Sequence, residues 1–171
     1  MGNKFVIADP EKCVGCKACM AACLVKHYVP GDVPIARLNV VRVKERTAPI
    51  LCHHCENAPC VAACPTGALY EDGDRVAVRM HRCIGCRSCV IACPYGACDV
   101  VERYDSAKLG DLKVGAIPKA MVIKCDRCAD RANGPACVEA CTSNALSIVE
   151  DTSIQGSREK RRAIDAASLT S

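Results

Sequence analysis

The sequence predicts an α+β fold that is rich in loops, with short strands and short helices. The chain of 171 residues contains one Phe, four Tyr and no Trp, so the aromatic side chains that fill most protein cores are scarce. It contains 17 cysteines, far above ordinary usage, and most of its short β-type runs lie beside groups of them. We therefore expect groups held by cysteine to occupy the middle of the molecule.

The predicted elements follow one another in a simple order. Short strands are expected at residues 4–8, 75–80, 121–124 and 145–150. A further strand at 38–46 would be a hairpin arm that links two modules. Residues 104–119 contain Gly and Pro and are predicted to form a turn-rich connector. The basic tail, residues 151–171, is predicted to be a helix or a frayed end, which is either solvated or docks on a partner.

The start of the chain points to a cytoplasmic protein. The segment MGNKFVIADPEKC leaves no room for an apolar signal core or a twin-arginine leader before the first cysteine. Gly2 resembles an N-myristoylation site, but Val6 stands where that motif requires Ser or Thr. No apolar run approaches the roughly 20 residues of a membrane span. In a reducing cytoplasm, clustered cysteines are more often metal ligands than disulfides.

Sixteen of the cysteines fall into four groups with one spacing rule. Each group is written C-x2-C-x(2, 4 or 8)-C-x3-C, and only Cys98 lies outside this internal repeat. The groups are CVGCKACMAAC (13–23), CHHCENAPCVAAC (52–64), CIGCRSCVIAC (83–93) and CDRCADRANGPACVEAC (125–141). Gly67, Gly96 and Asn144 stand at the same offset after the last cysteine of the final three groups. Because Gly and Asn accept positive φ, one turn is expected to recur three times.

The spacing favours [4Fe-4S] clusters over zinc. A tetrahedral zinc site usually takes two CxxC pairs from separate hairpins or from a hairpin and a helix, whereas at 13–23 and at 83–93 four cysteines lie within eleven residues. The pattern matches the bacterial ferredoxin run, in which three cysteines hold one cube and the fourth reaches a second cube. A structural zinc protein remains the alternative that metal analysis would settle.

The basic composition does not indicate nucleic-acid binding. Four cubes with four thiolates each would add about eight negative charges to the formal net charge of +4, which leaves about −4. Lysines and arginines flank three of the four groups, where they either compensate this charge or are merely solvated. The second group has His53, His54 and Glu56 in such positions. We expect these three residues to act beside the metal site or at an interface, with metal ligation by the histidines as the alternative. Fewer nearby cations should give the cluster at Cys52, Cys55 and Cys60 a lower potential than its neighbours.

The segments FVIADPEKCVGCKACMAAC, LCHHCENAPC, RCIGCRSCVIACPYGA and KCDRCADRANGPAC resemble the four-cluster ferredoxin subunits of redox enzymes. These enzymes are formate hydrogenlyase, hydrogenases, carbon monoxide dehydrogenase, formate dehydrogenase and aldehyde oxidoreductase; the dimethyl sulfoxide reductase β-subunit is a longer relative. The resemblance covers residues 4–150. Thr142 replaces a common Pro and Leu24 follows Cys23, but neither departure removes a ligand.

The resemblance implies two ferredoxin-like modules, one inserted into the other. An outer module (1–34 with 120–150) and an inner module (50–100) would hold two clusters each, and residues 35–49 and 101–119 would connect them. The implied ligand sets are Cys13, Cys16, Cys19 and Cys141; Cys23, Cys125, Cys128 and Cys137; Cys52, Cys55, Cys60 and Cys93; and Cys64, Cys83, Cys86 and Cys89. Cys98 is interpreted as a small buried residue in the strand ACDVVERY.

The resemblance further implies a non-catalytic electron-transfer subunit. It would carry single electrons between a catalytic subunit and a redox acceptor, and further copies of the chain in a filament are an additional candidate partner. We expect the catalytic subunit to be a molybdenum or tungsten enzyme, with hydrogenase and carbon monoxide dehydrogenase as alternatives. Sixteen cysteines satisfy four cubes, which leaves no open iron site, and no P-loop or Rossmann fingerprint is present. An assembly factor for such an enzyme would have the same motifs.

Overall fold

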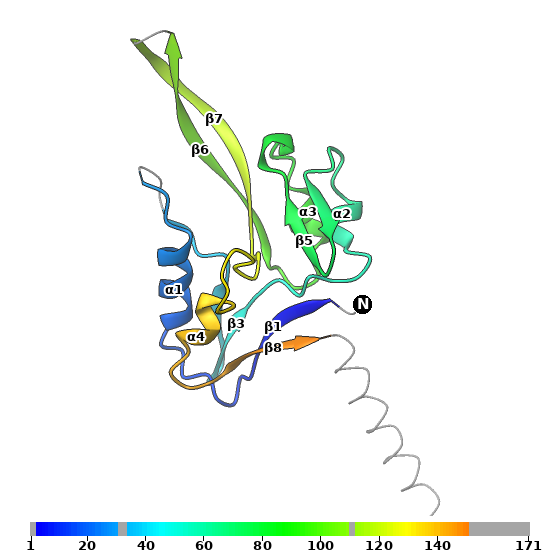
Figure 1. Cartoon of the computed structure of the whole chain (residues 1–171), viewed down its shortest axis with the longest axis vertical. Helices are drawn as coiled ribbons and strands as arrows, with labels where there is room; N and C mark the ends of the chain where they lie inside the picture. The colour runs from blue at the N-terminus through cyan, green and yellow to red at the C-terminus, as the bar shows by residue number, and fades with distance from the viewer. Residues whose placement is uncertain (1–2, 31–33, 110–111, 151–171) are drawn as a thin grey trace, which may run out of the picture.

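The computed structural model describes residues 3–30, 34–109 and 112–150. These residues form short antiparallel strand pairs and short helices, which confirms the α+β class (Figure 1). The strand pairs are β1 (Lys4–Ala8) with β8 (Leu146–Glu150), β2 (Asn39–Val43) with β3 (Arg46–Ile50), β4 (Leu69–Asp72) with β5 (Arg75–Val78), and β6 (Cys98–Leu109) with β7 (Leu112–Lys124). The α-helices are α1 (Ala18–Lys26), α2 (Pro59–Ala62), α3 (Ser88–Ala92) and α4 (Ala136–Glu139), and Met80–Arg82 form a 3₁₀ turn.

The elements gather into two halves. In the outer half, β1 pairs with β8 along its whole length, and α1 packs against α4. In the inner half, α2 packs against α3 and β4 pairs with β5. Figure 1 shows α1 and α4 on one side of the molecule and α2, α3 and β5 on the other. Segments from the two ends of the described chain therefore meet in the outer half.

The predicted strands lie close to observed ones, and the segment 38–46 is a hairpin arm as expected. The predicted runs 4–8 and 145–150 correspond to β1 and β8, the run 75–80 to β5, and the run 121–124 to the end of β7. The strand expected at 38–46 corresponds to β2, which is the first arm of a hairpin, because the chain turns at Lys44 with a φ of 55° and returns as β3.

The prediction of a turn-rich connector at 104–119 is wrong. These residues form most of a long hairpin, β6 with β7, that projects from the body of the molecule (Figure 1). Pro118 lies in β7 opposite Tyr104, and Gly115 lies opposite Ala107 beside a register shift. A strand in a two-stranded ribbon has one unpaired edge, so a proline there need not donate to the ladder. Gly and Pro therefore mark an edge strand here. The basic tail lies outside the described residues.

The hydrophobic core consists of two clusters in which cysteines stand where aromatic residues would be expected. The first combines Val6, Leu38, Leu51 and Leu146 with Cys19, Cys23, Cys125 and Cys137. The second combines Leu69, Val76, Val100 and Val122 with Cys60, Cys89 and Cys98. Cysteine side chains thus form part of the core in both halves, where groups held by cysteine are expected.

The repeated turn is also confirmed. Gly67, Gly96 and Asn144 have φ angles of 62°, 60° and 50°. Their backbone N–H groups donate to the carbonyl oxygens of Cys64, Cys93 and Cys141, three residues earlier, at 3.3, 3.2 and 3.1 Å. A residue with positive φ therefore follows each of the last three cysteine groups at the same offset.

Candidate metal centres

One cavity in the outer half is lined by four cysteines. Cys13, Cys16 and Cys19 come from the loop before α1 and from its first turn, and Cys141 follows α4. Val40, Pro49 and Leu146 form the apolar part of its wall. The β1–β8 pair and the packing of α1 on α4 bring these distant segments together.

A second cavity in the inner half repeats this arrangement. Cys83, Cys86 and Cys89 come from the loop before α3 and from its first turn, and Cys64 follows α2. Leu69, Val100 and Val122 complete its wall. We call these two groups of four cysteines the terminal sets.

The two terminal loops share one backbone conformation. Gly15 and Gly85 have φ angles of 71° and 75°, and Lys17 and Arg87 cap α1 and α3 in the left-handed region at 60° and 61°. This conformation turns each loop around its cavity before the helix begins. Cys16 and Cys86 are exposed, whereas the other cysteines of the described chain are buried or half-buried.

The remaining eight predicted ligands form two further groups, which we call the central sets. In one, burial and, to a smaller extent, the neighbouring thiols of Cys125, Cys23 and Cys128 together raise the pKa of Cys137 to about 12. In the other, burial raises the pKa of Cys60 to about 11, with contributions from Cys52, Cys93 and Cys55. The thiol of Cys52 also raises the pKa of Cys125, so the two central sets are neighbours.

Backbone N–H groups point at sulfur in several of these groups. The N–H groups of Arg37, His54, Ala97 and Ala145 donate to the Sγ atoms of Cys23, Cys52, Cys93 and Cys141 at 3.3, 3.4, 3.4 and 3.2 Å, respectively. Hydrogen bonds to sulfur are among the means by which a protein sets the potential of an iron–sulfur centre. Groups of four soft thiol donors that already accept backbone hydrogen bonds therefore fit iron–sulfur clusters, which require deprotonated thiols.

Cys98 is buried, as the sequence predicted. It lies at the start of β6, is 5% exposed and contacts the inner hydrophobic cluster. Burial raises its pKa, and its thiol is hydrogen-bonded to the thiol of Cys89. Cys98 thus packs between predicted ligands.

The two histidines of the second group make different contacts. His53 stacks between Phe5 of β1 and Tyr95 of the inner half, with ring centroids 4.8 and 3.8 Å apart. His54 is fully buried, and its Nδ1 atom accepts the N–H of Val76 at 3.1 Å. Burial is the main reason that the pKa of His54 falls to about 3, so the ring is neutral. The expected interface role fits His53. His54 instead accepts a backbone hydrogen bond from β5. Glu56 is exposed.

His27 lies beside a predicted ligand, although it belongs to none of the four cysteine groups. The His27 Nε2 atom lies 3.4 Å from a carboxylate oxygen of Asp126 and 4.0 Å from Cys128 Sγ. The hydrogen bond to Asp126 raises the pKa of His27 to about 9, so the imidazolium form lies beside a predicted ligand. No spacing signal connects residues 27 and 128, which lie 101 positions apart in the sequence, and only the folded structure brings them together.

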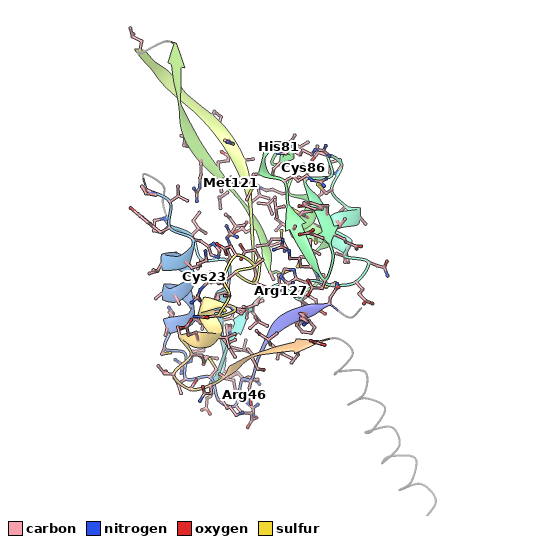
Figure 2. All side chains as sticks on the ribbon, viewed as in Figure 1. Cys23, Arg46, His81, Cys86, Met121 and Arg127 are labelled. Carbon is pink, nitrogen blue, oxygen red and sulfur yellow. The ribbon has the colours of Figure 1, made fainter. Side chains whose placement is uncertain are left out.

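The charges around the second cysteine group also differ from expectation. Lys124 is 4% exposed, and its ammonium lowers the pKa values of Cys55 and Cys60, although burial raises them. A residue beside the fourth group thus supplies the second group with a cation that its own segment does not contain. Figure 2 shows Arg127, also from the fourth group, between the half that holds Cys23 and the half that holds Cys86.

None of the helices in the described part of the chain is long and apolar enough to cross a membrane.

Comparison with known proteins identifies the family. Two models described as a 4Fe-4S dicluster domain match residues 12–69 and 43–111. "Electron transport protein HydN" of Escherichia coli (strain K12) is 43% identical over 169 residues, which cover 94% of this chain and 96% of HydN. "Formate hydrogenlyase subunit 2" of the same organism is 35% identical, with 94% and 88% covered. "Putative oxidoreductase AegA", also from this organism, is 39% identical over 94% of this chain, which spans only 24% of that protein. The chain therefore belongs to the family of 4Fe-4S dicluster electron-transport proteins that includes HydN.

Proposed function

We propose that the chain carries four [4Fe-4S] clusters as a linear wire. The terminal clusters would be held by Cys13, Cys16, Cys19 and Cys141 and by Cys64, Cys83, Cys86 and Cys89. The central clusters would be held by Cys23, Cys125, Cys128 and Cys137 and by Cys52, Cys55, Cys60 and Cys93. The two cavities support this assignment, since each is lined by three cysteines of one group and the last cysteine of another. An inner module of residues 50–100 inserted into an outer module (1–34 with 120–150) would produce this exchange.

One observation supports relay through the chain more than any other. Cys16 and Cys86 belong to the two terminal sets and are the exposed cysteines of the described residues, whereas the central sets lie deeper. Clusters of this type, when bound, exchange single electrons. Electrons would therefore enter near one exposed cysteine, cross the central clusters and leave near the other, without catalysis by this chain.

The proposed partner is a catalytic oxidoreductase subunit. We favour a molybdenum or tungsten formate dehydrogenase or aldehyde oxidoreductase, with a hydrogenase or carbon monoxide dehydrogenase as alternatives. The similarity to formate hydrogenlyase subunit 2 supports an enzyme of formate or hydrogen metabolism. A second redox carrier, or a further copy of this chain, would accept the electrons.

Anaerobic purification followed by metal and sulfide analysis tests this function. We expect about 16 iron and 16 acid-labile sulfide atoms per chain, with no stoichiometric zinc. Companion subunits that remain bound through the purification should include an enzyme of the proposed class. Stoichiometric zinc, or iron for fewer than four clusters, would contradict the proposal.

A further inference from the structure

Lys124 is a buried cation that contacts no carboxylate among the side chains that the structure describes. Among the residues whose side chains the structure describes, the buried residues with polar or charged side chains are His54 and Lys124. The Lys124 Nζ atom donates to the carbonyl oxygens of Val76 and Cys125 at 2.7 and 2.8 Å. Within the described residues it makes no ion pair. Because taking an ammonium group out of water is costly, a buried cation requires a compensating negative charge.

The other cations near the central sets already have such partners. Arg127 forms two hydrogen bonds with Asp74, and both His27 and Arg37 lie against Asp126. Each of these three cations thus contacts a carboxylate, with His27 and Arg37 sharing the single charge of Asp126. Among the described side chains near the central sets, Lys124 is the buried cation that contacts no carboxylate.

The position of Lys124 identifies the missing counter-charge. It directly precedes Cys125, to whose carbonyl oxygen it donates. Its ammonium also lowers the pKa values of Cys55, Cys60 and Cys125, so it lies close to thiols of both central sets. The proposed clusters would each carry about two negative charges at these positions when oxidised.

We propose that the Lys124 ammonium is a counter-charge shared by the two central clusters and that it raises their reduction potentials above those of the terminal clusters. Reduction adds one negative charge to a cluster, and a nearby cation in a poorly hydrated interior stabilises the reduced form more than the oxidised form. The middle of the wire is then its most easily reduced part. This inference rests on the proposed function, because it requires four bound clusters.

An anaerobic redox titration of the full chain, monitored by electron paramagnetic resonance, tests the inference. Lys124→Gln removes the charge but retains an amide donor for the backbone carbonyls, and Lys124→Arg retains the charge in a different shape. Lys119→Gln is the matched control, because Lys119 lies on the same strand but is exposed. The iron content of each variant is measured before titration.

In Lys124→Gln, two of the four midpoint potentials should fall. We expect at least a tenfold decrease in the ratio of reduced to oxidised cluster at a given potential, which is about 59 mV for a one-electron couple. The other two potentials should move much less, and Lys124→Arg and Lys119→Gln should retain all four. Unchanged potentials in Lys124→Gln, an equal shift of all four, or an equal shift in Lys124→Arg would overturn the inference.

Loss of iron from the Lys124 variants also tests the inference. If Lys124→Gln loses iron while Lys124→Arg keeps it, the charge is needed to hold the clusters, which supports the inference. If both variants lose iron, the shape of the side chain matters more than its charge, and the inference fails. A wild-type chain that holds fewer than four clusters disproves the proposed function instead, and the wild-type iron analysis shows this before any variant is compared.

Discussion

The guanidinium group of Arg127 forms a two-pronged ion pair with the carboxylate of Asp74, with Nη1–Oδ2 and Nη2–Oδ1 distances of 3.0 and 2.5 Å. Arg127 lies between two predicted ligands of the outer half, Asp74 lies in the turn between β4 and β5 of the inner half, and Arg127 also donates to the Lys4 carbonyl oxygen of β1. One side chain thus links three segments that are far apart in the sequence.

Replacing Asp74 with Ala should loosen the contact between the halves. Charge-assisted, two-pronged pairs are stronger than ordinary surface ion pairs, but Asp74 is partly exposed, so we expect a loss of about 1 kcal/mol in the free energy of unfolding. Anaerobic denaturant titration of the cluster-loaded chain measures it. Asp72→Ala is the control, because Asp72 pairs with Arg75 within the same hairpin. Equal losses in the two variants would show that the Arg127 pair does not join the halves.

Replacing Gly85 with Ala should destabilise the inner terminal loop. Gly85 has a φ of 75°, and an added Cβ atom would lie 2.7 Å from the Ala120 Cβ atom of β7. The left-handed backbone costs about 1–2 kcal/mol for an L-residue, and the contact with the hairpin adds to this. Gly73→Ala separates the two effects, because Gly73 has a φ of 63° and nothing within 4 Å of the added atom. Chemical unfolding should show a clearly larger loss for Gly85→Ala.

Replacing Cys98 with Ala should leave the iron content unchanged. The side chain is buried beside Cys89, so removal of the sulfur should cost about 1 kcal/mol of stability through lost packing. Iron analysis of the anaerobically purified variant measures this directly, with the predicted ligand variant Cys93→Ala as the comparison. Loss of a cluster from Cys98→Ala alone would mean that the proposed ligand sets are incorrect.

Replacing Tyr95 with Ala should weaken the stack in which His53 lies between Phe5 and Tyr95. Aromatic pairs contribute about 0.5–1.5 kcal/mol beyond the burial of their area. Tyr95→Phe keeps the ring and should unfold within about 0.5 kcal/mol of the wild type, because surface changes away from special features have small effects. If the Phe variant loses as much stability as the Ala variant, the hydroxyl group matters and stacking does not explain the contact.

Much of the molecule could be anticipated from local patterns. The turns at Gly67, Gly96 and Asn144 follow from the intrinsic tolerance of these residues for positive φ, and the strands at both ends of the described chain follow from short β-type runs. The connector at 104–119 was mispredicted because Gly and Pro were interpreted as turn residues. In an isolated two-stranded ribbon they are tolerated, since each strand has a free edge.

The sequence by itself determined the donor chemistry, because the identity and spacing of sixteen cysteines depend on no other part of the chain. Only the tertiary structure decided which charges lie beside them. The local sequence indicated few cations near Cys55 and Cys60, yet folding places Lys124 there from a position more than 60 residues away. Electrostatic interactions act through space and strengthen where water is excluded, so they follow the folded neighbourhood and not the order of residues along the chain.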